Sequence, residues 1–138
     1  MVTIRPAQTS DLPAISALDA RLTGAAKPDY WRERLALGLH FLVAETEKGA
    51  FAGVVAGEVR AGEFGQPPAG WVFAIQIDPK VRLRGVGSAL FEALVERFKA
   101  EGVTRVRTLV DRKDHLILSF FRAQGMVAGP SLQLDKEL

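Results

Sequence analysis

The sequence has no cysteine, a single tyrosine and only two histidines among its 138 residues. The lack of cysteine excludes disulfide bonds, zinc sites built on thiolates, and catalysis through a cysteine nucleophile or an acyl-cysteine. The histidines, His40 and His115, lie too far apart in the sequence to indicate a metal site. The sequence therefore predicts neither a metal cofactor nor covalent catalysis through sulfur.

Long apolar runs and a strong charge bias are also missing. No apolar run approaches the roughly 20 residues that span a membrane, and the N-terminus lacks the pattern of a signal peptide, so we expect a cytoplasmic protein with no membrane partner. A net charge of +2 is too small to argue for nucleic acid, although a pI of 9.2 suits an anionic cofactor. With 48% hydrophobic and 25% charged residues, we expect one globular domain over residues 1–138.

Hydrophobic periodicity and turn residues predict alternating strands and helices. The predicted strands cover residues 2–5, 41–45, 50–59, 71–77, 105–110 and 131–138. The predicted helices are one capped by Thr9 or Ser10, followed by helices over 30–37, 85–100 and 115–124. Residues 61–70 read as a loop. This order predicts an α/β fold with a mixed, twisted sheet.

Residues 77–90 carry the most specific signal. A hydrophobic strand ends there, and a turn rich in arginine and glycine leads directly into an amphipathic helix. The first turn of a helix has backbone N–H groups without intrahelical partners, and the helix dipole adds partial positive charge. Gly85 and Gly87 leave room for a ligand near the backbone, while Arg82 and Arg84 add full charges. The segment therefore predicts a pyrophosphate site.

The spacing within this segment selects among pyrophosphate sites. The sequence has no P-loop pattern, and the run after Gly85 lacks the third glycine of a dinucleotide fingerprint. Arg82-x-x-Gly85-x-Gly87 resembles the acetyl-CoA signature of the GNAT superfamily of N-acetyltransferases, Gln/Arg-x-x-Gly-x-Gly/Ala. A second segment, from Asp114 to Met126, resembles the superfamily's Asn-x-x-Ala-x-x-Phe-Tyr-x-x-x-Gly-Phe stretch.

The resemblance implies a single GNAT-like domain with six or seven strands, about four helices, and fourth and fifth strands that splay apart. It implies direct transfer of an acetyl group from acetyl-CoA, as cosubstrate, to a primary amine of a small molecule, an amino acid or a peptide or protein N-terminus. Two alternatives remain open: a non-catalytic CoA-binding sensor or scaffold, and an acyltransferase that uses another acyl-CoA.

The resemblance also assigns cofactor-binding positions. The backbone of Ile75 and Ile77 would pair with the pantetheine amides, and the backbone N–H near Ile77 would polarise the thioester carbonyl. Gln76 alternates with these two residues and either orients substrate or faces solvent. The remaining cofactor positions are Arg82, Leu83, Arg84, Gly85, Val86, Gly87, Ser88, Asp114 and Phe121.

The sequence departs from the family pattern at its proton-transfer positions. Phe121 stands where many members have a tyrosine that reprotonates the CoA thiolate, and residues 108–110 offer no glutamate as base. Glu58 is a candidate base, although a solvated carboxylate at a strand end is the plainer interpretation. Tyr30 is a candidate for the acceptor groove, although a half-buried anchor for its helix is the plainer interpretation.

The end of the chain is also unusual for this family, since only thirteen residues follow Gly125 where relatives usually build two strands. We therefore expect an acceptor groove that is open or covered by a second copy, and a homodimer is possible. The sequence does not identify the acceptor.

Overall fold

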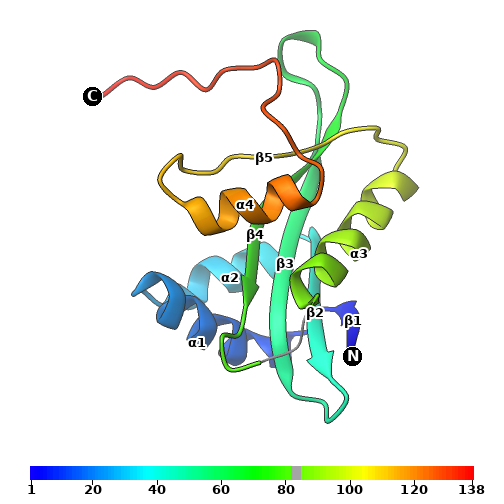
Figure 1. Cartoon of the computed structure of the whole chain (residues 1–138), viewed down its shortest axis with the longest axis vertical. Helices are drawn as coiled ribbons and strands as arrows, with labels where there is room; N and C mark the ends of the chain where they lie inside the picture. The colour runs from blue at the N-terminus through cyan, green and yellow to red at the C-terminus, as the bar shows by residue number, and fades with distance from the viewer. Residues whose placement is uncertain (82–84) are drawn as a thin grey trace.

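The computed structural model describes residues 1–81 and 85–138, and its centre is a five-stranded mixed sheet (Figure 1). The strands lie in the order of the chain, each antiparallel to its neighbour except the last pair, which is parallel. They are β1 (Val2–Pro6), β2 (His40–Thr46), β3 (Phe51–Arg60), β4 (Ala69–Ile77) and β5 (Val106–Thr108).

Four α-helices cover the two faces of this sheet. They are α1 (Leu12–Thr23), α2 (Pro28–Ala36), α3 (Val86–Ala100) and α4 (His115–Ala123). Side chains of α3 and α4 share one core cluster with the sheet, and side chains of α1 and α2 share the other. No helix in residues 1–81 or 85–138 is long and apolar enough to cross a membrane.

The first helix starts later than its predicted cap. Thr9 and Ser10 lie in a short 3-10 turn, and α1 begins after it. Asp11 stabilises the turn that delays the start of α1. Its carboxylate accepts the backbone N–H of Gln8 at 2.7 Å and two hydrogen bonds of 2.8 Å from the guanidinium of Arg5. The prediction of a Thr9 or Ser10 cap was therefore wrong: the N-cap position of α1 is Asp11, whose carboxylate bonds back to Gln8 and Arg5 and makes no side-chain hydrogen bond to the helix.

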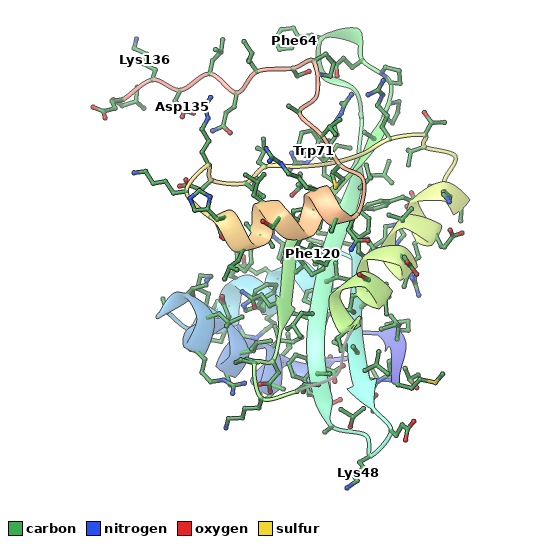
Figure 2. All side chains as sticks on the ribbon, in the orientation of Figure 1. Lys48, Phe64, Trp71, Phe120, Asp135 and Lys136 are labelled. Atoms are coloured by element: carbon green, nitrogen blue, oxygen red, sulfur yellow. The ribbon has the colours of Figure 1, made fainter. Side chains whose placement is uncertain are left out.

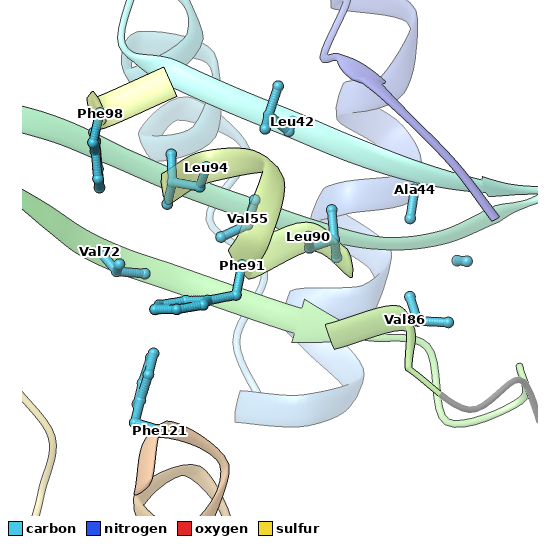
Figure 3. Close-up of a cluster of buried hydrophobic side chains, with 11 residues drawn as sticks. Leu42, Ala44, Val55, Val72, Val86, Leu90, Phe91, Leu94, Phe98 and Phe121 are labelled. Carbon is cyan, nitrogen blue, oxygen red and sulfur yellow. The ribbon is translucent and has the colours of Figure 1, made fainter. Parts of the chain in front are cut away.

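The core on the α3 side is an aliphatic and aromatic cluster (Figure 3). Phe121 of α4 points toward Phe91 of α3, and the centroids of the two rings are 6.1 Å apart. These rings bury the helix faces that the sequence periodicity predicted to be apolar. The two helices are thereby fixed relative to β4, which carries most of the site described below.

A β-bulge interrupts β4 at Phe73. Ala74 pairs with Ala56, but the next pair joins Val72 to Gly57, so Phe73 has no partner on β3. The extra residue reverses the alternation of side chains along the strand. Beyond the bulge, the α3 side therefore receives the odd-numbered residues Ile75 and Ile77.

The predicted last strand, over residues 131–138, is absent, so within residues 1–81 and 85–138 the sheet has five strands and not six or seven. β5 has only three residues, which gives a further strand little edge for pairing, and Pro130 lacks a backbone N–H. Residues 127–138 are exposed and run away from the sheet (Figure 1). Figure 2 shows Asp135 and Lys136 on this tail, far from the helices.

Candidate active site in the groove between β4 and β5

The two C-terminal strands of the sheet part after a short parallel ladder. Their last pair is Val72 with Thr108, and the hydroxyl of Thr108 donates a hydrogen bond of 2.8 Å to the carbonyl of Val72. β5 ends at this point, while β4 passes the bulge and continues to Ile77. The bulge and the end of the ladder thus coincide, and one edge of β4 is left open.

The backbone groups on this open edge belong to Ile75 and Ile77. The N–H of Asp78 donates to the carbonyl of Ala52 on β3 at 2.8 Å. Because successive residues of a strand direct their backbone groups to opposite sides, the N–H and C=O of Ile77 and of Ile75 point away from β3. The open edge can therefore form a ladder with an extended ligand.

A groove of about 390 Å³ follows this edge. Side chains from α1, α2, β4 and α4 and the residues around the end of β5 form its walls. Its polar side chains are Asp19, Thr23, Lys27, Tyr30, Gln76, Thr108, Asp111 and Asp114. Three of these side chains are carboxylates and one is an ammonium, so the described wall favours a cationic ligand.

Asp19 is the buried charge of this wall, with 1% of its surface exposed. Its Oδ2 accepts the indole N–H of Trp31 at 2.9 Å and lies 2.6 Å from the Lys27 ammonium. Its Oδ1 accepts the Nε2–H of Gln76 at 3.0 Å. Burial raises the pKa of Asp19, but these three donors outweigh burial and hold the pKa below its ordinary value. Asp19 is thus an ionised carboxylate inside the protein.

The N-terminus of α3 is the next helix start along the chain after the strand that lines the groove. Gly85 caps this helix with a left-handed φ of 80°, and a side chain there would meet open space. The N–H groups of Val86, Gly87 and Ser88 belong to the first turn, where a helix offers donors to an anion. The predicted cofactor residues Arg82, Leu83 and Arg84 lie outside the described residues.

The comparisons with known proteins agree with this geometry. A family model described as the acetyltransferase (GNAT) family matches residues 8–126. This chain belongs to the GNAT acetyltransferase family. The comparison with curated proteins finds no match for the sequence.

Solved structures show that the GNAT fold extends over the whole chain. An acetyltransferase from Trypanosoma brucei is 23% identical with a TM-score of 0.76, and the match covers 100% of both chains. An aminoglycoside 6′-N-acetyltransferase from Acinetobacter baumannii is 16% identical with a TM-score of 0.84, covering 100% of this chain and 99% of that one. An aminoglycoside N-acetyltransferase in complex with CoA is 17% identical with a TM-score of 0.84, covering 99% and 95%.

Gly87 has a packing role in this GNAT domain besides the anion-binding role that the motif predicted. A Cβ atom at Gly87 would lie 2.9 Å from Cε1 of Phe120, so the position faces α4. The absent side chain allows α3 and α4 to approach each other, whereas Gly85 faces open space. Of these two glycines, only Gly85 therefore offers a place where a side chain can be added without colliding with the fold.

The structure brings three further predicted residues to the groove. Tyr30 lies on its wall with its ring edge-on to Trp31, at a centroid distance of 5.1 Å. Asp114 caps α4, because its Oδ1 accepts the N–H of Ile117 at 3.2 Å. Phe121 lines the groove while only 4% of its surface is exposed.

The candidate base Glu58 lies elsewhere. It pairs with Trp71 near the start of β4, and its Oε1 accepts a hydrogen bond of 3.0 Å from Nε of Arg60. It is not among the described residues that line the groove. Its role as base stays a prediction.

The buried carboxylate was missed by the sequence reasoning. Asp19 falls one turn after Ile15 and next to Leu18, on the helix face that the periodicity predicts to be buried. A charged residue on such a face needs a buried partner. That signal was present in the sequence, but its partners on α2 and β4 could not be identified without the fold.

Proposed function

We propose that this chain is an N-acetyltransferase that transfers an acetyl group from acetyl-CoA directly to a primary amine. The observation that carries this proposal is the open edge of β4, where the backbone groups of Ile75 and Ile77 face away from β3 beside a groove. Membership of the GNAT family supports it.

The residues present fit CoA as a cosubstrate. The pantetheine amides can pair with Ile75 and Ile77 as an added strand does, because both residues direct their backbone groups to the open edge. The first-turn amides of α3, from Val86 to Ser88, follow β4 along the chain and suit the pyrophosphate. A structural neighbour of this fold was solved in complex with CoA, which supports the same class of ligand here.

Acetyl-CoA supplies a thioester, and the amine supplies the electron pair that forms the new bond. The C–N bond forms as the C–S bond breaks, the electron pair of the C–S bond leaves on sulfur, and the nitrogen gives up one proton. The backbone N–H of Ile77 lies on the open edge, where it can donate to the thioester oxygen as negative charge develops there.

Proton transfer requires no dedicated tyrosine on α4. Phe121 has no proton to give. A CoA thiolate can instead take a proton from water, or it can take the proton that the substrate nitrogen releases. Asp111 and Asp114 stand on the groove wall, where they suit the binding of a cationic acceptor. Several structural neighbours are aminoglycoside N-acetyltransferases, so a polycationic amine belongs in the first acceptor panel.

Two measurements test the proposal in sequence. Calorimetric titration with acetyl-CoA and with free CoA should give dissociation constants on the order of micromolar, or about −8 kcal/mol. A panel of an aminoglycoside, spermidine, free amino acids and a short peptide with a free N-terminus is then screened for thiol release.

Each outcome selects one of the readings of the sequence. Thiol release with acetylated product confirms the enzyme. If CoA binds but no amine causes thiol release from acetyl-CoA, the result supports a sensor or scaffold. Phe121 favours that alternative because its side chain has no proton to donate. Faster release from a longer acyl-CoA in a competition series identifies a different acyl donor. No binding of either nucleotide would remove the proposal.

A further inference from the structure

Gln76 carries a buried acceptor without a donor. Its Oε1 has no hydrogen-bond partner, and it is the one such buried side-chain atom among the residues that the structure describes. Buried polar atoms are nearly always paired in native proteins, so an unpaired one at a groove needs a physical account. Gln76 lies on the groove wall, on the strand whose backbone faces the same groove.

Asp19 fixes the direction in which this acceptor points. An ionised carboxylate can only accept hydrogen bonds, so Gln76 must present Nε2 to Asp19, at 3.0 Å from Oδ1. Turning the amide over would place Oε1 against a carboxylate oxygen and would be repulsive. Oε1 is therefore directed away from Asp19 by the chemistry of the pair.

Asp19 is itself held in place by groups outside this pair. Trp31 and Lys27 occupy its Oδ2, while its Oδ1 is bonded to Gln76. Three elements thus fix this carboxylate. α1 supplies Asp19 and also the hydroxyl of Thr23, which donates to Oδ1 at 3.3 Å; the start of α2 and the residue before it supply two donors, and β4 supplies Gln76. These hydrogen bonds fix the orientation of every polar group in the cluster, and the unpaired hydrogen-bond acceptor is Oε1 of Gln76.

The position of Gln76 on β4 distinguishes an acceptor role from a cofactor role. The bulge at Phe73 sends Ile75 and Ile77 to the α3 side, where the helix with the anion-binding N-terminus packs. Gln76 is directed to the opposite face, where it contacts Asp19 of α1. A ligand at Oε1 therefore approaches from the side of α1 and α2.

We infer that Oε1 of Gln76 accepts an N–H hydrogen bond from the amine substrate, and that Asp19 is a positioning residue that sets the orientation of this amide. The inference rests on the proposed N-acetyltransferase function and deepens it by naming a group that recognises the acceptor. The ligand is an amine that keeps at least one N–H for Gln76 while its lone pair attacks, and the primary amine of the proposed function meets this requirement.

Several physical features suit this role. An amide oxygen accepts a hydrogen bond without removing the proton, so Gln76 holds the amine but does not act as its base. As nitrogen forms the C–N bond it gains positive charge, and its N–H becomes a stronger donor. Oε1 exposes almost no surface, so the amine reaches it when a neighbouring side chain of the groove wall moves.

The first test replaces Gln76 by leucine, which keeps the side-chain bulk and removes both polar groups. Whichever panel amine is acetylated fastest serves as the probe. We expect the KM for this amine to rise about tenfold, the loss of one hydrogen bond, with the KM for acetyl-CoA unchanged. The Kd of the same amine for the protein saturated with free CoA, measured by calorimetry, should rise in parallel.

The second test reverses the polarity of the pair. In the double variant Asp19→Asn/Gln76→Glu, the oxygen of the introduced amide takes the place of the oxygen that Trp31 and Lys27 contact, and its NH₂ group donates to the introduced carboxylate. The second oxygen of that carboxylate then faces the groove as an acceptor, so the amine KM should return to within about threefold of its original value. Each single variant should perform worse: Gln76→Glu opposes two carboxylates, and Asp19→Asn lets Gln76 turn over.

These results distinguish failure of the inference about Gln76 from failure of the proposed N-acetyltransferase function. If the protein acetylates none of the panel amines, the proposed function fails and the inference fails with it. If an amine is acetylated but Gln76→Leu leaves its KM unchanged, or raises the KM for acetyl-CoA instead, only the inference is overturned. A double variant that restores thermal stability without restoring the amine KM also overturns it, because the pair would then be purely structural.

Discussion

Trp31 donates its indole N–H to the carboxylate of Asp19 at 2.9 Å, and this bond joins α2 to α1 behind the groove. Both side chains are almost fully buried. A hydrogen bond to a buried charge contributes about 1.5–3 kcal/mol, so Trp31→Phe should lower the free energy of unfolding by that amount in a urea titration. Trp71→Phe is the control, because it makes the same change of side chain at a ring that packs under Arg60 and not against Asp19. Equal losses in the two variants would contradict the role of the bond.

The stability of the fold should fall in acid, and Asp19 should account for part of the fall. Burial raises its pKa, but donors from Lys27, Gln76 and Trp31 lower it further. A carboxylate with a depressed folded-state pKa stabilises the fold above its unfolded pKa, about 3.9, and this contribution is lost as pH falls through the folded value. Asp19→Asn should therefore flatten the dependence of unfolding free energy on pH below about pH 4.

The control for this pH prediction is Asp29→Asn. Asp29 is also a helix carboxylate with a basic partner, Arg32, but 79% of its side chain is exposed. Exposed pairs contribute about 0–1 kcal/mol, so this variant should keep the slope of the unchanged protein. The prediction fails if Asp19→Asn keeps that slope too.

Cofactor binding is tested most cleanly at Gly85. Its φ of 80° makes any side chain there unfavourable by about 1 kcal/mol, but the space around it is open. Gly85→Ala and Gly85→Glu have the same backbone cost, and only glutamate adds a negative charge at the N-terminus of α3. We expect glutamate to weaken CoA binding by about tenfold beyond alanine in calorimetry. Equal affinities in the two variants would move the pyrophosphate away from this helix.

The sequence predicted the helices and the first five strands because these elements carry strong local signals. The stripe of apolar residues along α3 and the glycine at its start required only periodicity and turn chemistry. The last strand failed because residues 131–138 alternate apolar and polar side chains without an edge to pair with. A strand needs a partner, and local sequence does not reveal the length of β5.

Some residues of the candidate site could be predicted from the sequence, and others could not. Ile75, Ile77 and Gly85 follow a contiguous motif, so their neighbourhood on β4 and α3 could be predicted. Asp19 meets Gln76 across 57 positions of sequence, and that contact depends on the bulge at Phe73, which selects the face of Gln76. Neither the bulge nor a contact of that separation has a local signature.

Phe121 allows a test of which step limits turnover. Its ring lines the groove and packs 5.3 Å from Phe120, between centroids, and tyrosine keeps this ring while adding one hydroxyl. We expect Phe121→Tyr to leave the Kd for CoA unchanged and to raise kcat by less than the roughly 10²–10⁴-fold of full general-acid catalysis, since in the proposed mechanism water or the substrate supplies the proton.

Stopped-flow measurement of thiol release under single-turnover conditions decides whether the gain lies in chemistry or in product release. Phe121→Leu is the matched control, because it changes the packing against Phe91 without adding a proton donor. If Phe121→Tyr has the original kcat, then protonation of the thiolate does not limit the rate, and the hydroxyl on α4 that other members of the family carry is dispensable in this groove.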